Sequence, residues 1–337
     1  MKFCVVGAGS IGGYVGVKLA AAGEDVTLIA RGPNLEAIRA RGMRLTMADG
    51  TEYIAPGIRA TASLAEAGPH DVVILAMKAH QVAPVAKDLH HLLHGKTVVV
   101  PMQNGIPWWY FQRHGGPFEG RRIENVDPDG AIMGAIDPAR IIGCVVYPAC
   151  ELAAPGIVRH IEGDRFPLGE LDGTETPRLL RVAEAFQRAG LKAPVLTAIR
   201  AEMWLKLWGN LTFNPISALT HSTLVDICQF PPTRELATAM MREAEQVANK
   251  LGVGFRVTLE KRIAGAEKVG KHKTSMLQDV EAGRDPEIDA LVGAVIELGA
   301  LTGVPTPHID TAYALVKLLG RTMQEERVSI RAQPFGR

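Results

Sequence analysis

The chain has 337 residues, enough for two domains that each bury a sizeable core. A hydrophobic fraction of 47% with 22% charged residues is typical of globular proteins and excludes an extended disordered chain. The formal net charge of +1 excludes a broad basic surface for nucleic acid or an anionic membrane, so we expect a small-molecule partner.

A glycine-rich segment follows the first predicted strand, Lys2 to Val6. It reads Gly7-Ala8-Gly9-Ser10-Ile11-Gly12 and opens a predicted helix that ends at Gly23. Two glycines allow a sharp turn and close approach to a pyrophosphate, and the third lets helix and strand pack closely. The N–H groups at the start of the helix would bind phosphate oxygens. Because a second strand, Asp25 to Ala30, follows, we interpret the segment as a dinucleotide-binding loop rather than a plain tight turn.

Apolar runs further along predict more strands of a doubly wound parallel sheet. Asp71 to Ala76 and Thr97 to Val100 flank a predicted helix from Gln81 to Leu93. Later candidate strands are Ile142 to Val146, Ile157 to Ile161 and Ala193 to Leu196. From about residue 198 the apolar periodicity is helical. We therefore expect an α/β fold, with a Rossmann-type domain over residues 1–197 and an all-helical domain over residues 198–337.

The cysteines are few and lack CxxC spacing: Cys4, Cys144, Cys150 and Cys228. This usage argues against a disulfide framework and a structural zinc site, and it favours a cytoplasmic location. His90 and His94 have the i, i+4 spacing of metal ligands but lack the glutamate of the HExxH motif, so we expect no metal. No stretch approaches the roughly 20 apolar residues of a membrane span.

The residue after the second strand indicates which dinucleotide binds. NAD-specific folds place a carboxylate there, which accepts hydrogen bonds from the ribose 2′-hydroxyl. This chain has Ala30 and then Arg31, whose guanidinium can pair with a 2′-phosphate. We predict NADP(H) as the cofactor. The alternative is that Arg31 is a solvated loop residue.

Two groups of polar residues are candidates for the site. Lys78 and Asn104 each follow a strand, at the sheet edge where ligands bind, although both also suit ordinary solvated turns. A second group shares one helix face within about 80°, opposite Trp204 and Trp208, and consists of Lys206, Asn210 and Asn214. The alternative is a solvated stripe, in which Glu202 could pair with Lys206 one turn away. Mid-helix asparagines cost roughly 0.5 kcal/mol each relative to alanine, which favours a ligand over this stripe.

Two further polar residues have an ordinary structural explanation. Ser275 begins a capping-box pattern with Gln278, and Glu287 follows Asp285-Pro286 at a typical helix start. Capping alone would account for both residues.

Together these motifs resemble the ketopantoate reductase (2-dehydropantoate 2-reductase) family over most of the chain. The matching segments are Gly7 to Gly12, Arg31, Lys78, Gln103-Asn104-Gly105, Trp204 to Pro215, Ser275 to Asp279 and Glu287 to Asp289. The resemblance implies NADPH-dependent reduction of a 2-oxoacid, foremost ketopantoate to pantoate, with Lys206 as the proton donor. It also implies a substrate cleft between the two domains and leaves a homodimer open.

The resemblance also assigns roles residue by residue. The implied substrate contacts are Asn104, Asn210, Asn214, Ser275 and Glu287. The implied cofactor contacts are Gly7, Ala8, Gly9, Ser10, Ile11, Gly12, Arg31, Lys78, Asn104, Ala149 and Glu287. The alternatives are a bulkier 2-oxoacid as substrate, a hydroxyacid or polyol-phosphate dehydrogenase of the same plan, or a non-catalytic NADP-binding sensor.

The segment between Gly105 and Gly143 looks longer than the family pattern. Five aromatic residues lie between Trp108 and Phe118. A segment that leaves the sheet beside Asn104 could form a lid or a dimer contact over the site. The alternative is an aromatic surface insertion packed on its own domain.

Overall fold

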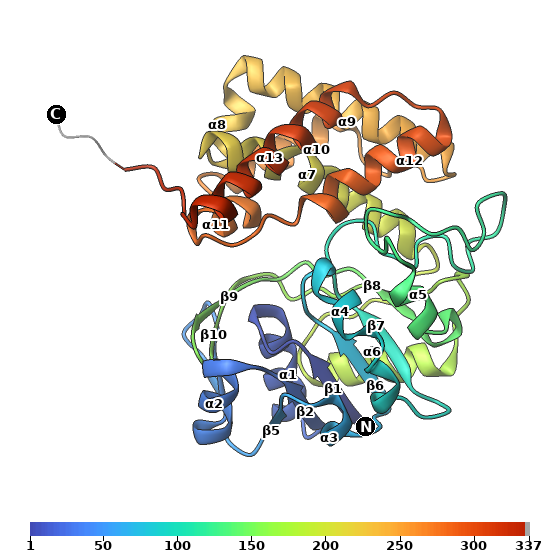
Figure 1. Cartoon of the computed structure of the whole chain (residues 1–337), viewed down its shortest axis with the longest axis vertical. Coiled ribbons are helices and arrows are strands. Elements are labelled where there is room, and N and C mark those ends of the chain that lie inside the picture. Colours follow the sequence, from blue (N-terminus) through green and yellow to red (C-terminus); the bar gives the residue numbers. More distant parts are fainter. Residues whose placement is uncertain (334–337) are drawn as a thin grey trace. The chain divides into compact units, whose positions relative to one another are not determined.

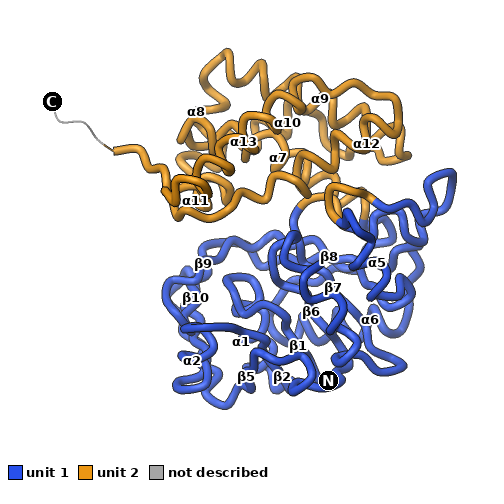
Figure 2. Tube along the Cα trace, viewed as in Figure 1, with its two compact units in different colours: residues 1–104, 108–122, 127–199 blue, residues 105–107, 123–126, 200–337 orange. Residues whose placement is uncertain are grey.

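The structure is a computed structural model that describes residues 1–333. It divides the chain into two compact units, coloured separately in Figure 2. Unit 1 contains residues 1–104, 108–122 and 127–199, and unit 2 contains residues 105–107, 123–126 and the chain from Arg200 onward.

A parallel sheet of five strands forms the centre of unit 1, in the order β5-β2-β1-β6-β7 (Figure 1). Its strands are β1 (Lys2–Val6), β2 (Asp25–Ile29), β5 (Arg59–Thr61), β6 (Val72–Leu75) and β7 (Val98–Pro101). The four residues of β6 and the four of β7 are all buried, which explains why these strands are continuous apolar runs in the sequence. Strand order reverses between β1 and β6, the position at which such sheets bind ligands. The predicted doubly wound sheet is confirmed.

A second sheet in unit 1 covers the other side of helix α1 (Ser10–Ala21). Its order is β4-β3-β10-β9, from β3 (Met43–Thr46), β4 (Glu52–Ala55), β9 (Ala149–Ala154) and β10 (Ile157–Glu162). A Cβ on Gly16 would lie 2.7 Å from Leu28 of the first sheet, and one on Gly13 would lie 2.7 Å from Val158 of the second. The glycines of α1 therefore let it pack tightly between two sheets.

The remaining elements of unit 1 surround these sheets. A two-stranded sheet pairs β8 (Ile142–Cys144) with β11 (Leu168–Glu170). The α-helices are α2 (Gly32–Arg41), α3 (Leu64–Ala67), α4 (Ala83–Ala86), α5 (Ala131–Ala135) and α6 (Pro177–Arg188). The 3₁₀ helices are η1 (Ala79–Gln81), η2 (Leu89–Leu92) and η3 (Pro138–Arg140).

Two sequence expectations for unit 1 were wrong in detail. The helix expected from Gln81 to Leu93 is broken into η1, α4 and η2. Pro84, in the first turn of α4, has no N–H to continue a helix from η1. The strand expected from Ala193 to Leu196 makes only an isolated bridge, Leu168 with Val195.

Unit 2 is helical, as expected. Its elements are α7 (Ile199–Thr220, with its first residue in unit 1), α8 (Leu224–Gln229), α9 (Pro231–Lys250), α10 (Leu259–Val269), α11 (Ser275–Glu281), the π-helix η4 (Asp289–Gly293), α12 (Ala294–Thr302) and α13 (Pro307–Glu326). Trp208 anchors the core: its ring stacks on Phe255 at 4.1 Å, and its Nε1 donates to the carbonyl oxygen of Met241 at 2.7 Å. Across residues 1–333, no helix has both the length and the apolar character that crossing a membrane requires.

Two short segments from the first half of the chain are held on helices of unit 2. The N–H of Ile106 donates to the carbonyl oxygen of Ala290 in η4 at 2.8 Å. The Glu297 carboxylate of α12 accepts the N–H groups of Glu124 and Asn125 at 2.8 and 2.9 Å. These bonds explain why residues 105–107 and 123–126 belong to unit 2.

The aromatic insertion is part of the core of unit 1. The side chains of its four consecutive aromatic residues are at most 3% exposed: Trp108, Trp109, Tyr110 and Phe111. Phe111 packs edge-on against Tyr110, with ring centroids 4.9 Å apart, and it also contacts Phe118. These four buried rings form neither a lid or dimer surface nor the surface insertion that was the alternative, because they are core residues.

This burial predicts a large effect of truncation. Phe111→Ala should lower the free energy of unfolding by about 3–5 kcal/mol, because it leaves a cavity in a packed core. Phe230→Ala, at a position 59% exposed, should change it by less than about 0.5 kcal/mol. Urea denaturation of both variants measures the difference, and equal stabilities would contradict the assignment of Phe111 to the core.

Candidate functional site

The loop after β1 has the geometry of a phosphate cradle. Gly7 has φ +103°, and its N–H and that of Ala8 both donate to the carbonyl oxygen of Ile29, each at 3.1 Å. A Cβ on Gly12 would lie 1.9 Å from the Gly7 carbonyl oxygen, so only glycine lets α1 approach the loop this closely. A Cβ on Gly9 would meet nothing within 4 Å. The loop thus combines a sharp turn, close helix packing and open space at its middle glycine, which fits a dinucleotide pyrophosphate.

The start of α1 is suited to an anion. Its N-cap residue is Gly9, which provides no side chain to cap the helix, and its first turn contains no acidic residue. The first N–H groups of a helix carry a partial positive charge. Ser10 and Ile11 lie in this first turn, so their N–H groups are candidates for binding phosphate oxygens.

Asn34 of α2 supports the same loop and is not among the residues expected from the sequence. Its Nδ2 donates to the carbonyl oxygen of Ala8 at 2.7 Å, and its Oδ1 accepts the N–H of Gly156 at 2.8 Å. The side chain therefore ties the cradle to the turn between β9 and β10. An asparagine near a helix start is common, so nothing in the sequence marked this one as different.

The structure places the other cofactor candidates of unit 1 as follows. Arg31 is exposed two residues after β2 and is the N-cap of α2. Lys78 is the N-cap of η1 after β6, and Asn104 is half-buried in the turn after β7. Arg31, Lys78 and Asn104 therefore follow the carboxyl ends of strands in the same parallel sheet as the cradle. Ala149 instead begins β9 of the second sheet.

Gln103 holds the turns that contain Lys78 and Asn104. Its Nε2 donates to the carbonyl oxygens of Leu75 and Met77, at 2.7 and 3.1 Å. This side chain bridges the ends of β6 and β7. It was noted in the sequence only as a neighbour of Asn104.

A cysteine–histidine pair in unit 1 has no features of a nucleophilic site. Cys150 of β9 is paired with His160 of β10 across the second sheet. Burial raises the pKa of the Cys150 thiol to about 12, so the thiolate that acts as a nucleophile is scarce at neutral pH. Tyr14 stacks on His160, with ring centroids 5.0 Å apart. The pair belongs to the packing of α1.

In unit 2, α7 presents the lysine and both asparagines on one side of an unbroken helix. Lys206 and Asn210 are half-buried, and Asn214 is 5% exposed. The helix continues through Pro215. The Nδ2 of Asn214 is buried, and it has no hydrogen-bond partner among residues 1–333. A buried amide without a partner is costly, which a polar ligand would relieve.

Glu202 does not belong to a solvated stripe. It is 3% exposed, and its Oε2 lies 2.6 Å from Nη2 of Arg256, in the connection between α9 and α10. The alternative of a solvated helix face therefore fails for this residue.

The structure changes the structural explanations for Ser275 and Glu287. Thr274, not Ser275, caps α11: its hydroxyl accepts the N–H of Leu277 at 3.3 Å, and Ser275 is exposed at the first helical position. Glu287 precedes a π-helix rather than an α-helix. Such π-helical turns frequently occur at functional sites. Capping by its side chain, as the sequence suggested, therefore does not explain Ser275.

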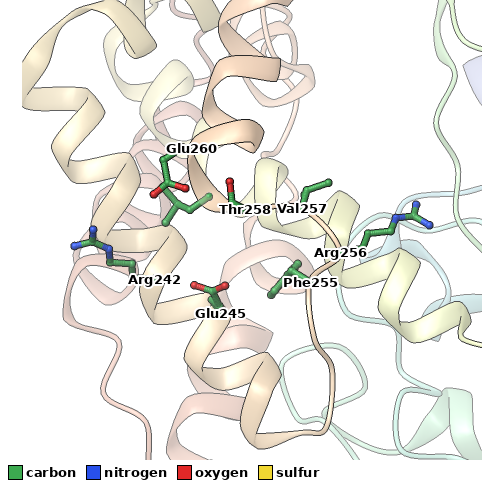
Figure 3. A pocket seen from close by; sticks show the side chains of 8 residues that line it. Arg242, Glu245, Phe255, Arg256, Val257, Thr258 and Glu260 are labelled. Atoms are coloured by element: carbon green, nitrogen blue, oxygen red, sulfur yellow. The ribbon is translucent and has the colours of Figure 1, made fainter.

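A hollow of about 370 Å³ lies on unit 2 between α9 and the start of α10 (Figure 3). Its lining includes Arg242, Glu245, Arg256 and Glu260. It contains none of the candidate residues of the sequence analysis. Within residues 1–333, no group of three or more histidine, cysteine, aspartate or glutamate residues is arranged to hold a metal ion.

Two family models match the chain. The model described as ketopantoate reductase PanE/ApbA matches residues 3–173, and the model of the C-terminal part of the same proteins matches residues 198–320. Together they cover the cradle, the sheet and most of the helices of unit 2.

Individual proteins are similar over nearly the whole chain. A 2-dehydropantoate 2-reductase from Mesorhizobium japonicum is 55% identical, over 95% of this chain and 98% of its own. One from Pyrococcus horikoshii is 30% identical, over 94% and 97%. The crystal structure of a candidate ketopantoate reductase from Ralstonia solanacearum has a TM-score of 0.91 and 43% identity, over 96% and 98%.

The cradle geometry predicts different effects at its two glycines. Gly9→Ser should leave the stability of the apoprotein within about 0.5 kcal/mol, because serine is a good N-cap and the space is open. Gly12→Ser should lower stability by about 1–3 kcal/mol, because its Cβ would overlap the Gly7 carbonyl. Both variants should weaken NADPH binding. Thermal unfolding and fluorescence titration with NADPH measure the two effects, and tight binding by Gly9→Ser would contradict the cradle.

Proposed function

The chain belongs to the ketopantoate reductase family, and we propose that it reduces 2-dehydropantoate to pantoate with NADPH. In this proposal, unit 1 is the cofactor-binding domain and unit 2 is the substrate-binding domain. The cofactor contacts are the cradle residues with Arg31, Lys78, Asn104, Ala149 and Glu287. The substrate contacts are Asn104, Asn210, Asn214, Ser275 and Glu287.

The reaction adds a hydride and a proton across a ketone. Bound NADPH supplies the hydride to the ketone carbon. The Lys206 ammonium donates the proton to the carbonyl oxygen, and its positive charge stabilises the developing alkoxide. Ketone and cofactor are thereby converted to a secondary alcohol and NADP⁺, with the lysine left neutral until it takes a proton from water.

The observation that carries the substrate assignment is the buried amide of Asn214. Its Nδ2 has no partner within residues 1–333, although the residue is 5% exposed. Asn214 shares its helix face with Lys206 and Asn210. An oxoacid offers carbonyl, hydroxyl and carboxylate oxygens that can accept from such an amide. A non-catalytic NADP sensor would have no use for this arrangement.

The choice of NADPH over NADH is supported by Arg31. It is exposed just beyond β2, at the position where NAD-specific folds have a carboxylate. Gly32, with φ +53°, turns the chain directly afterwards into α2. A guanidinium at this place pairs with a 2′-phosphate and has no equivalent partner on NADH.

Lys206→Ala tests the catalytic assignment. The variant should lower kcat about 100- to 10,000-fold, the range that a positioned general acid contributes, and should leave the NADPH dissociation constant unchanged. Lys250→Ala, at an exposed lysine that ends α9, is the control and should keep full activity. Steady-state kinetics with ketopantoate and a panel of bulkier 2-oxoacids measure both. An unchanged rate would remove Lys206 from this role, and a wild type inactive on every 2-oxoacid would refute the reductase.

Arg31→Ala tests the cofactor assignment. It should weaken NADPH binding about 10- to 100-fold, because charge-assisted hydrogen bonds to the 2′-phosphate are lost, and should leave NADH binding unchanged. Arg41→Ala, at an exposed arginine that ends α2, should change neither affinity. Calorimetric titration measures both cofactors. An equal loss of affinity for NADPH and NADH would show that Arg31 does not bind the 2′-phosphate.

A further inference from the structure

A buried carboxylate lies one helical turn before Lys206 on α7. Glu202 is 3% exposed, and its side chain points into protein rather than water. Residues four apart on a helix have Cβ atoms about 5–6 Å apart, which is close enough for the carboxylate charge to influence an ammonium at Lys206. The negative charge favours the protonated lysine that the reaction needs.

Arg256 is the partner that keeps the Glu202 carboxylate in place. The two side chains meet at 2.6 Å, although the residues are 54 positions apart in the sequence. The Arg256 side chain is 61% exposed and that of Glu202 is 2% exposed. In Figure 3 the guanidinium of Arg256 extends away from Arg242 and Glu260, which line the opposite side of the hollow. Arg256 therefore supplies a positive charge to a buried carboxylate.

A second arginine approaches the same helix from α10. A Cβ on Gly209 would lie 2.0 Å from Nη2 of Arg262, so the guanidinium rests on the backbone of α7 three residues after Lys206. Arg256 and Arg262 thus bring two positive charges to α7, beside the negative charge of Glu202. Neutralising Glu202 would remove this negative charge and disfavour the Lys206 ammonium.

We propose that Glu202, held by Arg256, is a positioning residue that keeps Lys206 protonated for proton transfer. The proposal rests on the proposed function, in which Lys206 is the proton donor. Arg256 limits the effect of Glu202 by neutralising part of its charge. The two members of the pair therefore act on the lysine in opposite directions.

The opposite signs give a sharp test. Above the pH at which Lys206 loses its proton, kcat falls. Glu202→Gln removes the negative charge and should move this alkaline limb to lower pH by roughly one unit. Arg256→Met keeps an unbranched side chain but removes its positive charge from Glu202, so the limb should move to higher pH. Arg256→Lys keeps the positive charge and should restore the wild-type profile.

The control and the second readout separate this inference from the proposed function. Glu325→Gln breaks an exposed Arg–Glu pair on α13, and it should not move the limb. In the apoprotein, an amine-reactive acetylating reagent modifies only neutral lysine, so mass spectrometry of the Lys206 peptide against pH reports the same titration without turnover. Opposite shifts of the labelling midpoint in Glu202→Gln and Arg256→Met support the inference.

One result would overturn this inference, and a different result would overturn the proposed function on which it rests. If both variants lose activity at every pH and neither the limb nor the labelling midpoint moves, the pair is structural and the inference is wrong. If the labelling midpoints shift in opposite directions but the wild type reduces no 2-oxoacid, the electrostatic pairing is correct and the proposed function is wrong.

Discussion

The close approach of α1 to the loop after β1 is the constraint on which unit 1 depends. It exists because Gly12 has no side chain to collide with the Gly7 carbonyl. The same helix must also fit between two sheets, which Gly13 and Gly16 allow. Close packing therefore fixes the position of the cradle. A loop that is already formed would not need to be ordered when the proposed cofactor binds, which lowers the free-energy cost of binding.

The chemistry proposed for unit 2 depends on helix α7, which has charged and polar side chains in a partly buried position. Trp204 and Trp208 on one side of α7 are fully buried and hold the helix in its place. The other side carries Lys206, Asn210 and the buried Glu202. Burying polar groups costs stability unless they are paired. Arg256 pairs with Glu202. The proposed substrate would pair with the buried amide of Asn214. The stability cost of burying these polar groups is therefore consistent with a binding site.

Much of the candidate site was predictable because its signals are local. Gly7 to Gly12 follow a strand and open a helix, and the i, i+4, i+8 spacing of Lys206, Asn210 and Asn214 follows from helix geometry alone. The features that were missed or misjudged depend on distant partners. Asn34 looks like any helix-start asparagine until Gly156 lies next to it, and Ser275 looks like a cap until Thr274 takes that role. The aromatic insertion looked like a surface feature because burial of Trp108 to Phe111 depends on the rest of unit 1.

The sequence by itself determined the glycine-rich loop between a strand and a helix, the parallel sheet, the helical second half and the face of α7, because each depends on backbone propensity and periodicity within a few residues. Only the tertiary structure decided that α1 lies between two sheets and that the aromatic rings are core. It also brought Arg256 to Glu202, 54 positions away. Such contacts form when apolar surfaces pack and remaining charges find partners, and no local pattern in the chain encodes which residue that partner is.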